Sequence, residues 1–442
     1  MSPARQIAHM PNIDLAVIAL GGSGDPVSTA DVLFSRDYPD GVVAPVDVNL
    51  ASTAVRYVRW DIDRWNGGTF SSATGRQLTV KGWKDNPPLT AGDDIVPGRT
   101  HALLRFMAPY PGSLFKLMIA FQTLRLVDRG ILHLNGAYSF DPKGGCFAAA
   151  PGTETNRQRL DAMITESDNR SACALVKQLH QLGQIDAMNS EFRALGLNTL
   201  QVNGTSGETG SHWEPGQIDM TALDTARLLL LINGGPGVLW RAPGGQAVTA
   251  NVLSRSSRAV LKGLLAQQGY NEALSTTNWC GRSYPAQGIP QRVASRWINP
   301  FTGTVTVEGK DYGQDVRPCN AAAQVSFAHK TGLSYNYGSD AGIVQSLPGK
   351  PYRHYIIAFL SNLGDRYADP QFKTTTTLPC FALPGVCYTQ KIAQLGNLVD
   401  TLLTRSPQAT DLVRYLPHLP APSIGAHPVR PPTSSPTAGV PN

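Results

Sequence analysis

Pro111-Gly112-Ser113-Leu114-Phe115-Lys116 is the stretch around which the chain is organised. A Pro/Gly turn leads here into apolar residues at helical spacing that continue to Leu124. The pattern predicts a helix that starts near residue 113 and is buried at its N-terminal end. Ser113 falls in the first turn, where backbone N–H groups have no partner within the helix. Lys116 follows three residues later, on the same face of the helix.

A serine hydroxyl is a weak nucleophile at neutral pH unless a neighbouring base accepts its proton. A partly desolvated lysine one helical turn away can act as that base. Ser-x-x-Lys occurs once in the chain, at Ser113 and Lys116. Such pairs are nevertheless common on helix surfaces, so this one alone is weak evidence for catalysis.

Two further triplets each occur once, Ser167-Asp168-Asn169 and Lys330-Thr331-Gly332. The first lies between helical patterns at 157–165 and 171–182, where a plain helix cap is the alternative reading. The second follows a strand pattern at 324–329. Strand alternation puts Lys330 and Gly332 on one face, and His329 on the other face as a packing residue.

Ser-x-x-Lys, Ser-Asp-Asn and Lys-Thr-Gly in this order are the signature of class A β-lactamases and penicillin-binding proteins. The chain resembles this superfamily of active-site serine enzymes over about residues 45–404. The resemblance implies an α/β (α+β) β-lactamase/transpeptidase-like fold. An antiparallel sheet would be flanked by helices, and an all-helical subdomain would carry the Ser-Asp-Asn motif.

The resemblance also implies catalytic roles for four residues. Ser113 would attack a carbonyl, and Lys116 would accept its proton. Ser167 would pass a proton to the departing nitrogen. Lys330 would favour the neutral form of Lys116 and help to hold the substrate carboxylate.

Four more positions match the substrate-binding part of the family pattern. Thr331, with Gly332 beside it, would bind the substrate carboxylate, and Asn169 would orient the acyl-side amide. The backbone amides of Ser113 and Leu333 would stabilise the tetrahedral oxyanion, a contribution of roughly 3 kcal/mol per donor.

The residue that would drive deacylation is harder to assign. Class A β-lactamases use a glutamate in a loop after the second motif, and this chain has no glutamate at the matching position. Asn203 or Gly204 falls near that position, and neither can act as a base. Glu214, in a Trp-Glu-Pro tripeptide, is the candidate general base, with Glu208 and Glu166 as weaker candidates. The segment after Glu214 is shorter than the loop of the family. We therefore expect acylation more firmly than efficient β-lactam hydrolysis.

The expected function is that of a serine hydrolase, acylated on Ser113 by β-lactams or related amides and esters. The alternatives are a D-alanyl-D-alanine carboxypeptidase, an esterase and a penicillin-binding sensor without turnover. An α/β-hydrolase is disfavoured because the chain has no Gly-x-Ser-x-Gly elbow.

Composition excludes several other classes. Of 442 residues, 42% are hydrophobic and 16% are charged, which suits a large buried core. The net charge of +6 is scattered, which argues against a nucleic-acid partner. No zinc-binding spacing is present, so we expect no metal and no cofactor. The expected partner is a small β-lactam or peptidoglycan-type substrate, bound by a monomer.

The six cysteines suit an oxidising compartment, with small buried thiols as the alternative. Two pairings suggest themselves, Cys280 with Cys319 and Cys380 with Cys387. The apolar run 15–20 is shorter than a secretory core, and no run reaches the length of a membrane span. We expect a periplasmic or secreted protein whose numbering begins after a processed leader.

The predicted organisation has three parts. Residues 1–44 are an N-terminal extension, 45–404 the catalytic domain with an insertion at about 278–323, and 405–442 a Pro-rich disordered tail. Further patterns predict helices over 48–65, 218–232 and 388–403 and strands over 77–83, 101–107, 338–345 and 355–363.

Overall fold

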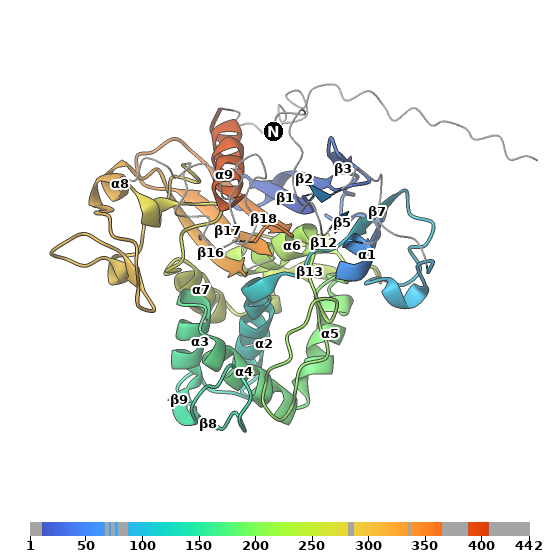
Figure 1. Ribbon diagram of the computed structural model, residues 1–442, viewed down its shortest axis with the longest axis horizontal. Coiled ribbons are helices and arrows are strands. Elements are labelled where there is room, and N and C mark those ends of the chain that lie inside the picture. Colours follow the sequence, from blue (N-terminus) through green and yellow to red (C-terminus); the bar gives the residue numbers. More distant parts are fainter. Residues whose placement is uncertain are drawn as a thin grey trace, which may run out of the picture.

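The structure is a computed structural model that describes residues 11–66, 70–71, 76–77, 87–281, 287–334, 337–364 and 388–405. Its centre is a six-stranded sheet in the order β16-β17-β18-β1-β2-β3 (Figure 1). Every neighbouring pair in this sheet is antiparallel. The strands are β1 Ile13–Leu20, β2 Pro26–Phe34, β3 Val42–Ala44, β16 Val325–Leu333, β17 Gly338–Ser346 and β18 His354–Ser361.

Helices cover both faces of the sheet. The helix α6 (Ala222–Asn233) packs against β1, β17 and β18. On the other face, Ile392 and Leu403 of α9 (Tyr388–Arg405) share an apolar cluster with residues of β1, β16, β17 and β18. Alternate residues of β1 therefore enter different cores, Ile18 beneath α6 and Leu15 beneath α9. Figure 1 shows α9 and α6 on opposite sides of the sheet.

The mainly helical part below the sheet surrounds α2, which is buried over nearly its whole length. The helices here are α2 Lys116–Asp128, α3 Asn156–Thr165, α4 Asn169–Gln181, α5 Gln184–Ala194 and α7 Arg255–Leu265. The Ser-Asp-Asn triplet lies between α3 and α4, as expected. The predicted fold class is confirmed, with one addition: a hairpin of β8 (Ala137–Phe140) and β9 (Gly152–Thr155) joins the helices.

Short elements complete the described chain. They are α1 Ile62–Asn66, α8 Arg317–Ala322, the parallel pair β4 Val55–Val58 and β7 Leu104–Met107, and the antiparallel pairs β5 Phe70–Ser71 with β6 Arg76–Gln77, β10 Gln201–Val202 with β11 Ile218–Asp219, β12 Val238–Arg241 with β13 Ala247–Thr249, and β14 Thr306–Val307 with β15 Lys310–Asp311. No helix in the described part of the chain is both long and apolar enough to cross a membrane.

The N-terminal region differs from the sequence expectation. The predicted boundary at residue 44 does not separate an extension from the catalytic domain, because β1, β2 and β3 form half of the central sheet. The apolar run 15–20 is a strand buried on both faces, and such strands lack the alternation that marks a half-exposed strand. The helix predicted over 48–65 is also wrong, since this segment holds β4 and the short α1.

The remaining element predictions are confirmed where they can be compared. The helices expected at 157–165, 171–182, 218–232 and 388–403 are α3, α4, α6 and α9, and the strands expected at 101–107, 324–329, 338–345 and 355–363 are β7, β16, β17 and β18. The strand at 77–83, the Cys380–Cys387 pair and the tail 405–442 lie almost entirely outside the described residues.

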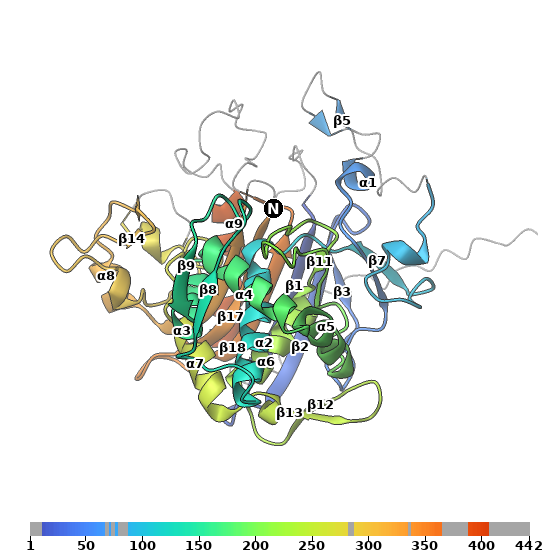
Figure 2. The ribbon, with the colours of Figure 1, turned by 90° about the horizontal axis from the view of Figure 1, so that it is seen from below.

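The predicted insertion forms a small unit beside β16. Val305, Val307, Tyr312 and Val316 pack with Trp279 in a separate apolar cluster. A disulfide joins Cys280 to Cys319, as the sequence suggested. Figures 1 and 2 show α8 of this unit on the side of the molecule away from β7.

The end of β16 approaches the turn before α2 very closely. A Cβ atom at Gly332 would overlap Pro111 O and Ser339 Oγ and would lie 2.8 Å from Leu114 N. The Ser339 hydroxyl donates to Pro111 O at 2.5 Å and to Gly332 O at 3.1 Å, which ties this turn to β16 and β17. Only glycine at position 332 permits this approach.

We therefore expect Gly332→Ala to lower the free energy of unfolding by about 1–3 kcal/mol, because β16 must move away from the turn. Denaturant unfolding measures this change. Gly263→Ala is the matched control, since Gly263 is exposed in α7 and a Cβ atom added there would have nothing within 4 Å. It should keep or raise stability by up to about 1 kcal/mol. Equal stability of the two variants would contradict the close approach.

Candidate active site

Ser113 lies in a 3-10 turn, Gly112–Phe115, that leads directly into α2. Gly112 has a φ of +57°, in the left-handed region that favours glycine. Ser113 is half-buried, and its hydroxyl has no hydrogen-bond partner among the described residues. The hydroxyl is thus not engaged by another described side chain or backbone group.

Lys116, the first residue of α2, is completely buried. Its Nζ donates to Asn169 Oδ1 at 2.7 Å and to Ser167 Oγ at 3.3 Å, and it also contacts Ser167 O. The structure therefore connects the first and second motifs directly. The predicted transfer of a proton from Ser113 to Lys116 needs a contact that this arrangement does not contain, although catalytic contacts often tighten only when substrate binds.

Ser167 occupies the turn between α3 and α4 with a φ of +61°, an unusual conformation for a residue other than glycine. Asp168 caps α4 by accepting hydrogen bonds from the N–H groups of Arg170 at 3.2 Å and Ser171 at 2.7 Å. Asp168 thus forms the helix cap that was the alternative reading, and the functional reading of the triplet stays a prediction. Asp168 holds the turn, while Ser167 and Asn169 face Lys116.

Lys330 on β16 is also completely buried, and its Nζ donates to Ser167 Oγ at 2.9 Å and to Thr331 O at 2.7 Å. The Ser167 hydroxyl thus lies between two amines. As expected, His329 is a packing residue: it is buried, stacks on Phe327 and bonds Asp340 at 2.7 Å.

The substrate-binding candidates lie around this centre. Thr331 and Gly332 are buried or nearly so in β16, opposite Asp340 and Ser339 of β17. Leu333 ends the strand and is half-buried. Because Gly332 touches Pro111 and Leu114, the end of β16 runs beside the Ser113 turn. The backbone of these two segments is where the family pattern expects an oxyanion site.

Burial dominates the electrostatics of the two lysines. Desolvation lowers the pKa of Lys116 to about 7, opposed by the nearby charges of Asp168 and Glu308. Desolvation, together with the charge of Lys116, holds the pKa of Lys330 well below its usual range. A buried amine with a pKa near neutrality can accept a proton at physiological pH, which an ordinary lysine cannot.

Glu308 is the acidic residue that sequence reasoning missed. It sits at the β14–β15 turn of the insertion, and its Oε2 accepts a hydrogen bond from Tyr270 Oη at 3.1 Å. The preceding Val307 packs on Gly269, whose N–H donates to Thr165 O at 2.8 Å, two residues before Ser167. The charge of Glu308 reaches both Lys116 and Lys330. No sequence motif marks it, because the position of this hairpin is set by the fold and not by spacing in the sequence.

The candidate bases for deacylation do not contact the motif residues among the described hydrogen bonds. Glu214 is exposed, and its backbone oxygen accepts from the N–H groups of Gln217 and Ile218. Glu208 is exposed as well. Asn203 bonds Asn189 at 3.2 Å. Glu166 is half-buried, and burial together with the charge of Glu308 raises its pKa.

The neighbour of Glu214 is the residue that reaches the site. The Trp213 ring packs against Phe115 and Phe147, at centroid distances of 5.0 and 5.2 Å, and lies 5.7 Å from Lys116 Nζ. Trp213 Nε1 donates to Gly210 O at 2.8 Å, which fixes the ring against its own loop. Trp213 therefore forms an apolar wall beside the buried amine and helps to keep it dry.

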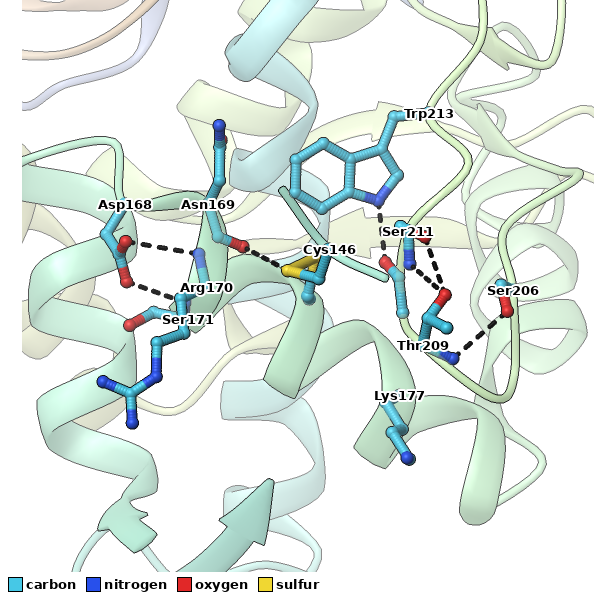
Figure 3. The surroundings of a disulfide bond; sticks show 12 residues. Cys146, Asp168, Asn169, Arg170, Ser171, Lys177, Ser206, Thr209, Ser211 and Trp213 are labelled. Atoms are coloured by element: carbon cyan, nitrogen blue, oxygen red, sulfur yellow. Dashed lines mark hydrogen bonds between the residues drawn. A yellow bond between two sulfur atoms is a disulfide. The ribbon is translucent and has the colours of Figure 1, made fainter. Parts of the chain in front are cut away.

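A disulfide that the sequence did not single out braces the second motif. It joins Cys146 to Cys173 of α4. Cys146 Sγ lies 3.5 Å from Asn169 O, and Figure 3 shows the disulfide between Asn169 and the loop that carries Trp213. The bond thus holds the segment before β9 against the N-terminal half of α4, directly behind Asn169. Among the described residues, no group of three or more His, Cys, Asp or Glu side chains could hold a metal ion.

Comparisons with known proteins identify the family that the chain resembles. Residues 108–283 match the model of the Beta-lactamase enzyme family. The solved structure of PBP-A is 18% identical, with 67% of this chain and 82% of that chain covered and a TM-score of 0.41. A β-lactamase from Chitinophaga pinensis DSM 2588 is 18% identical, with 64% and 84% covered and a TM-score of 0.37. One from Sphaerobacter thermophilus DSM 20745 is 15% identical, with 67% and 82% covered and a TM-score of 0.39. No curated protein sequence matches the chain.

If Lys116 is the base, the rate of Ser113 acylation must depend on its neutral form. We expect the acylation rate constant for a fluorescent penicillin to rise with pH through about 7 and then to level off, because the proton leaves Lys116 in this range. Stopped-flow fluorescence measures this profile. Lys116→Ala should lose at least about 100-fold in rate. A variant that acylates as fast as the parent would rule out Lys116 as the base.

Glu308 should act on the same profile from a distance. Its negative charge raises the pKa of Lys116, so Glu308→Gln should move the acidic limb of the profile to lower pH. Acylation below pH 7 should then be roughly twofold faster, as expected for a partly screened charge. Asp311→Asn is the matched control, since this exposed carboxylate of the same hairpin accepts, among the described residues, only from Gly313 N. If Asp311→Asn shifted the pH profile of acylation by the same amount, the effect would come from the change in net charge and not from the position of Glu308.

Proposed function

Given that residues 108–283 match the Beta-lactamase enzyme family, we propose that the protein is a serine hydrolase that forms a covalent acyl-enzyme on Ser113. The substrates proposed are β-lactams and related amides or esters that carry a carboxylate. The observation that carries this proposal is the meeting of three motif segments at Ser167 Oγ, which lies 3.3 Å from Lys116 Nζ and 2.9 Å from Lys330 Nζ.

In the proposed acylation, Ser113 Oγ attacks the carbonyl carbon while its proton passes to neutral Lys116. The oxyanion that forms lies between the Ser113 turn and the end of β16, where backbone N–H groups can stabilise it. The carbon–nitrogen bond then breaks, and the nitrogen takes a proton through the Ser167 hydroxyl. Lys116 supplies the replacement proton to Ser167, so that the site returns to its starting charge.

Lys330 contributes in two ways in this proposal. Burial and then the charge of Lys116 lower the pKa of Lys330, so a second positive charge beside Lys116 is disfavoured before a substrate binds. With Thr331 it also offers donors to a substrate carboxylate. A carboxylate bound there would restore a positive charge on Lys330, because an ion pair stabilises the protonated amine.

Slow deacylation is supported by the position of Glu214, whose exposed side chain has no described hydrogen bond to the motif residues. The second candidate function is therefore a D-alanyl-D-alanine carboxypeptidase, in which a β-lactam would act as a long-lived inhibitor. The two disulfides support the proposal of a periplasmic or secreted location, since such bonds persist in oxidising compartments.

The direct test is the intact mass of the protein over time after mixing with a fluorescent penicillin. We expect a covalent adduct that is absent in Ser113→Ala, because that variant lacks the nucleophile. Decay of the adduct within seconds would favour a β-lactamase, and persistence for hours would favour the carboxypeptidase. An adduct that also forms on Ser113→Ala, or no adduct on the parent protein, would overturn the proposal.

A further inference from the structure

A cavity of about 410 Å³ lies away from the three motifs and shares no residue with them. Its walls come from the segment 47–57 before and within β4, from residues 196–199 after α5, from the first turn of α6, and from the β12–β13 turn at 241–245. A volume of this size is typical of sites for small molecules. Nothing in the acylation chemistry requires this cavity.

Three arginines line the cavity, Arg99, Arg227 and Arg241, against the two acids Asp47 and Asp224. The acids are already engaged. Asp47 Oδ1 accepts the N–H groups of its own turn, and Asp224 accepts from Arg227 at 2.8 Å. Among the described residues, the side chains of Arg99 and Arg241 bond only backbone carbonyls, of Thr53 at 3.2 Å and of Gly245 at 3.1 Å. Two guanidinium charges therefore face the cavity without a carboxylate partner.

Arg227 forms the floor and is only 2% exposed. One side of its guanidinium is fixed by Asp224 and by Gly196 O at 2.7 Å, and its plane lies 4.6 Å from the Trp240 ring centroid. Its Nε has no hydrogen-bond partner among the described residues. This atom is enclosed by protein, so Arg227 contributes a fixed, buried positive charge beneath the cavity rather than a free donor.

Two further features of the walls suit a negative ligand. The first turn of α6 lines the cavity through Thr221 and Leu223, so the positive end of the helix dipole points toward it. The walls also carry three arginines against two aspartates, so their net charge is positive. The walls thus offer donors and positive charge, while the carboxylates are already occupied.

We propose that this cavity binds a small organic anion that carries a carboxylate or phosphate group. Arg99 and Arg241 at the rim would grip the anionic group, as guanidinium forks do with planar or tetrahedral oxyanions. The buried charge of Arg227 beneath them would add to the attraction. The site is independent of the proposed reaction at Ser113, so either proposal can fail alone.

The test uses isothermal titration calorimetry on the full chain with three probes of similar size: D-glucuronate, D-glucose 6-phosphate and D-glucose. We expect millimolar or tighter binding of at least one anion and no binding of neutral glucose. The first two probes distinguish a carboxylate ligand from a phosphate ligand. Binding should weaken in high salt, because screening reduces the attraction between charges.

The double variant Arg99→Gln/Arg241→Gln should weaken anion binding at least about tenfold and leave Ser113 acylation unchanged. The matched control is Arg255→Gln/Arg292→Gln, which removes the same charge from exposed positions outside the cavity and should bind as the parent does. Thermal melts confirm that both proteins are folded. The proposal is overturned if neither anion binds at about 10 mM, if glucose binds equally well, or if both double variants behave alike.

Discussion

The site depends on one unfavourable condition, the burial of two lysine amines on either side of a single hydroxyl. Lys116 and Lys330 are both fully buried, and both donate to Ser167 Oγ. Two ammonium groups cannot share such a place without a large desolvation cost. The fold therefore favours a neutral amine there at neutral pH, and this neutral amine is what serine activation needs. In the proposed mechanism, the reactivity of Ser113 would arise from the packing that keeps water out.

That packing is assembled from parts distant in the sequence. Gly332 lets β16 touch the turn before α2, and the Cys146–Cys173 bond holds the segment behind Asn169. Trp213 covers the amine of Lys116 from a third direction. Each of these contacts restricts the position of a different motif segment. Their combined effect is that the three motifs are held together before a substrate arrives.

The parts of the site that lie in short motifs could be predicted from the sequence. Residues whose positions depend on contacts distant in the sequence could not. Ser113, Lys116 and Lys330 could be found because each lies in a short motif on a recognisable element. The role of β1 could not, because a strand buried on both faces has a continuous apolar run rather than an alternation. Glu308, an exposed residue whose charge acts on both lysines, was missed for a different reason: its position depends on how a hairpin of the insertion folds back, and spacing carries no information on that. The pairing of Cys146 with Cys173 was likewise undetermined by sequence.

The position of β1 also constrains the order in which the protein can fold. Ile13 lies opposite Ser361, so the two strands that pair at the centre of the sheet lie far apart in the sequence and are synthesised at different times. A β1–β2 hairpin can form early, but its apolar edge stays open until β18 emerges from the ribosome. Contacts of such sequence separation close slowly. The nascent chain therefore exposes an unpaired, aggregation-prone edge on β1 until β18 has been synthesised. The sheet can be completed only after that point.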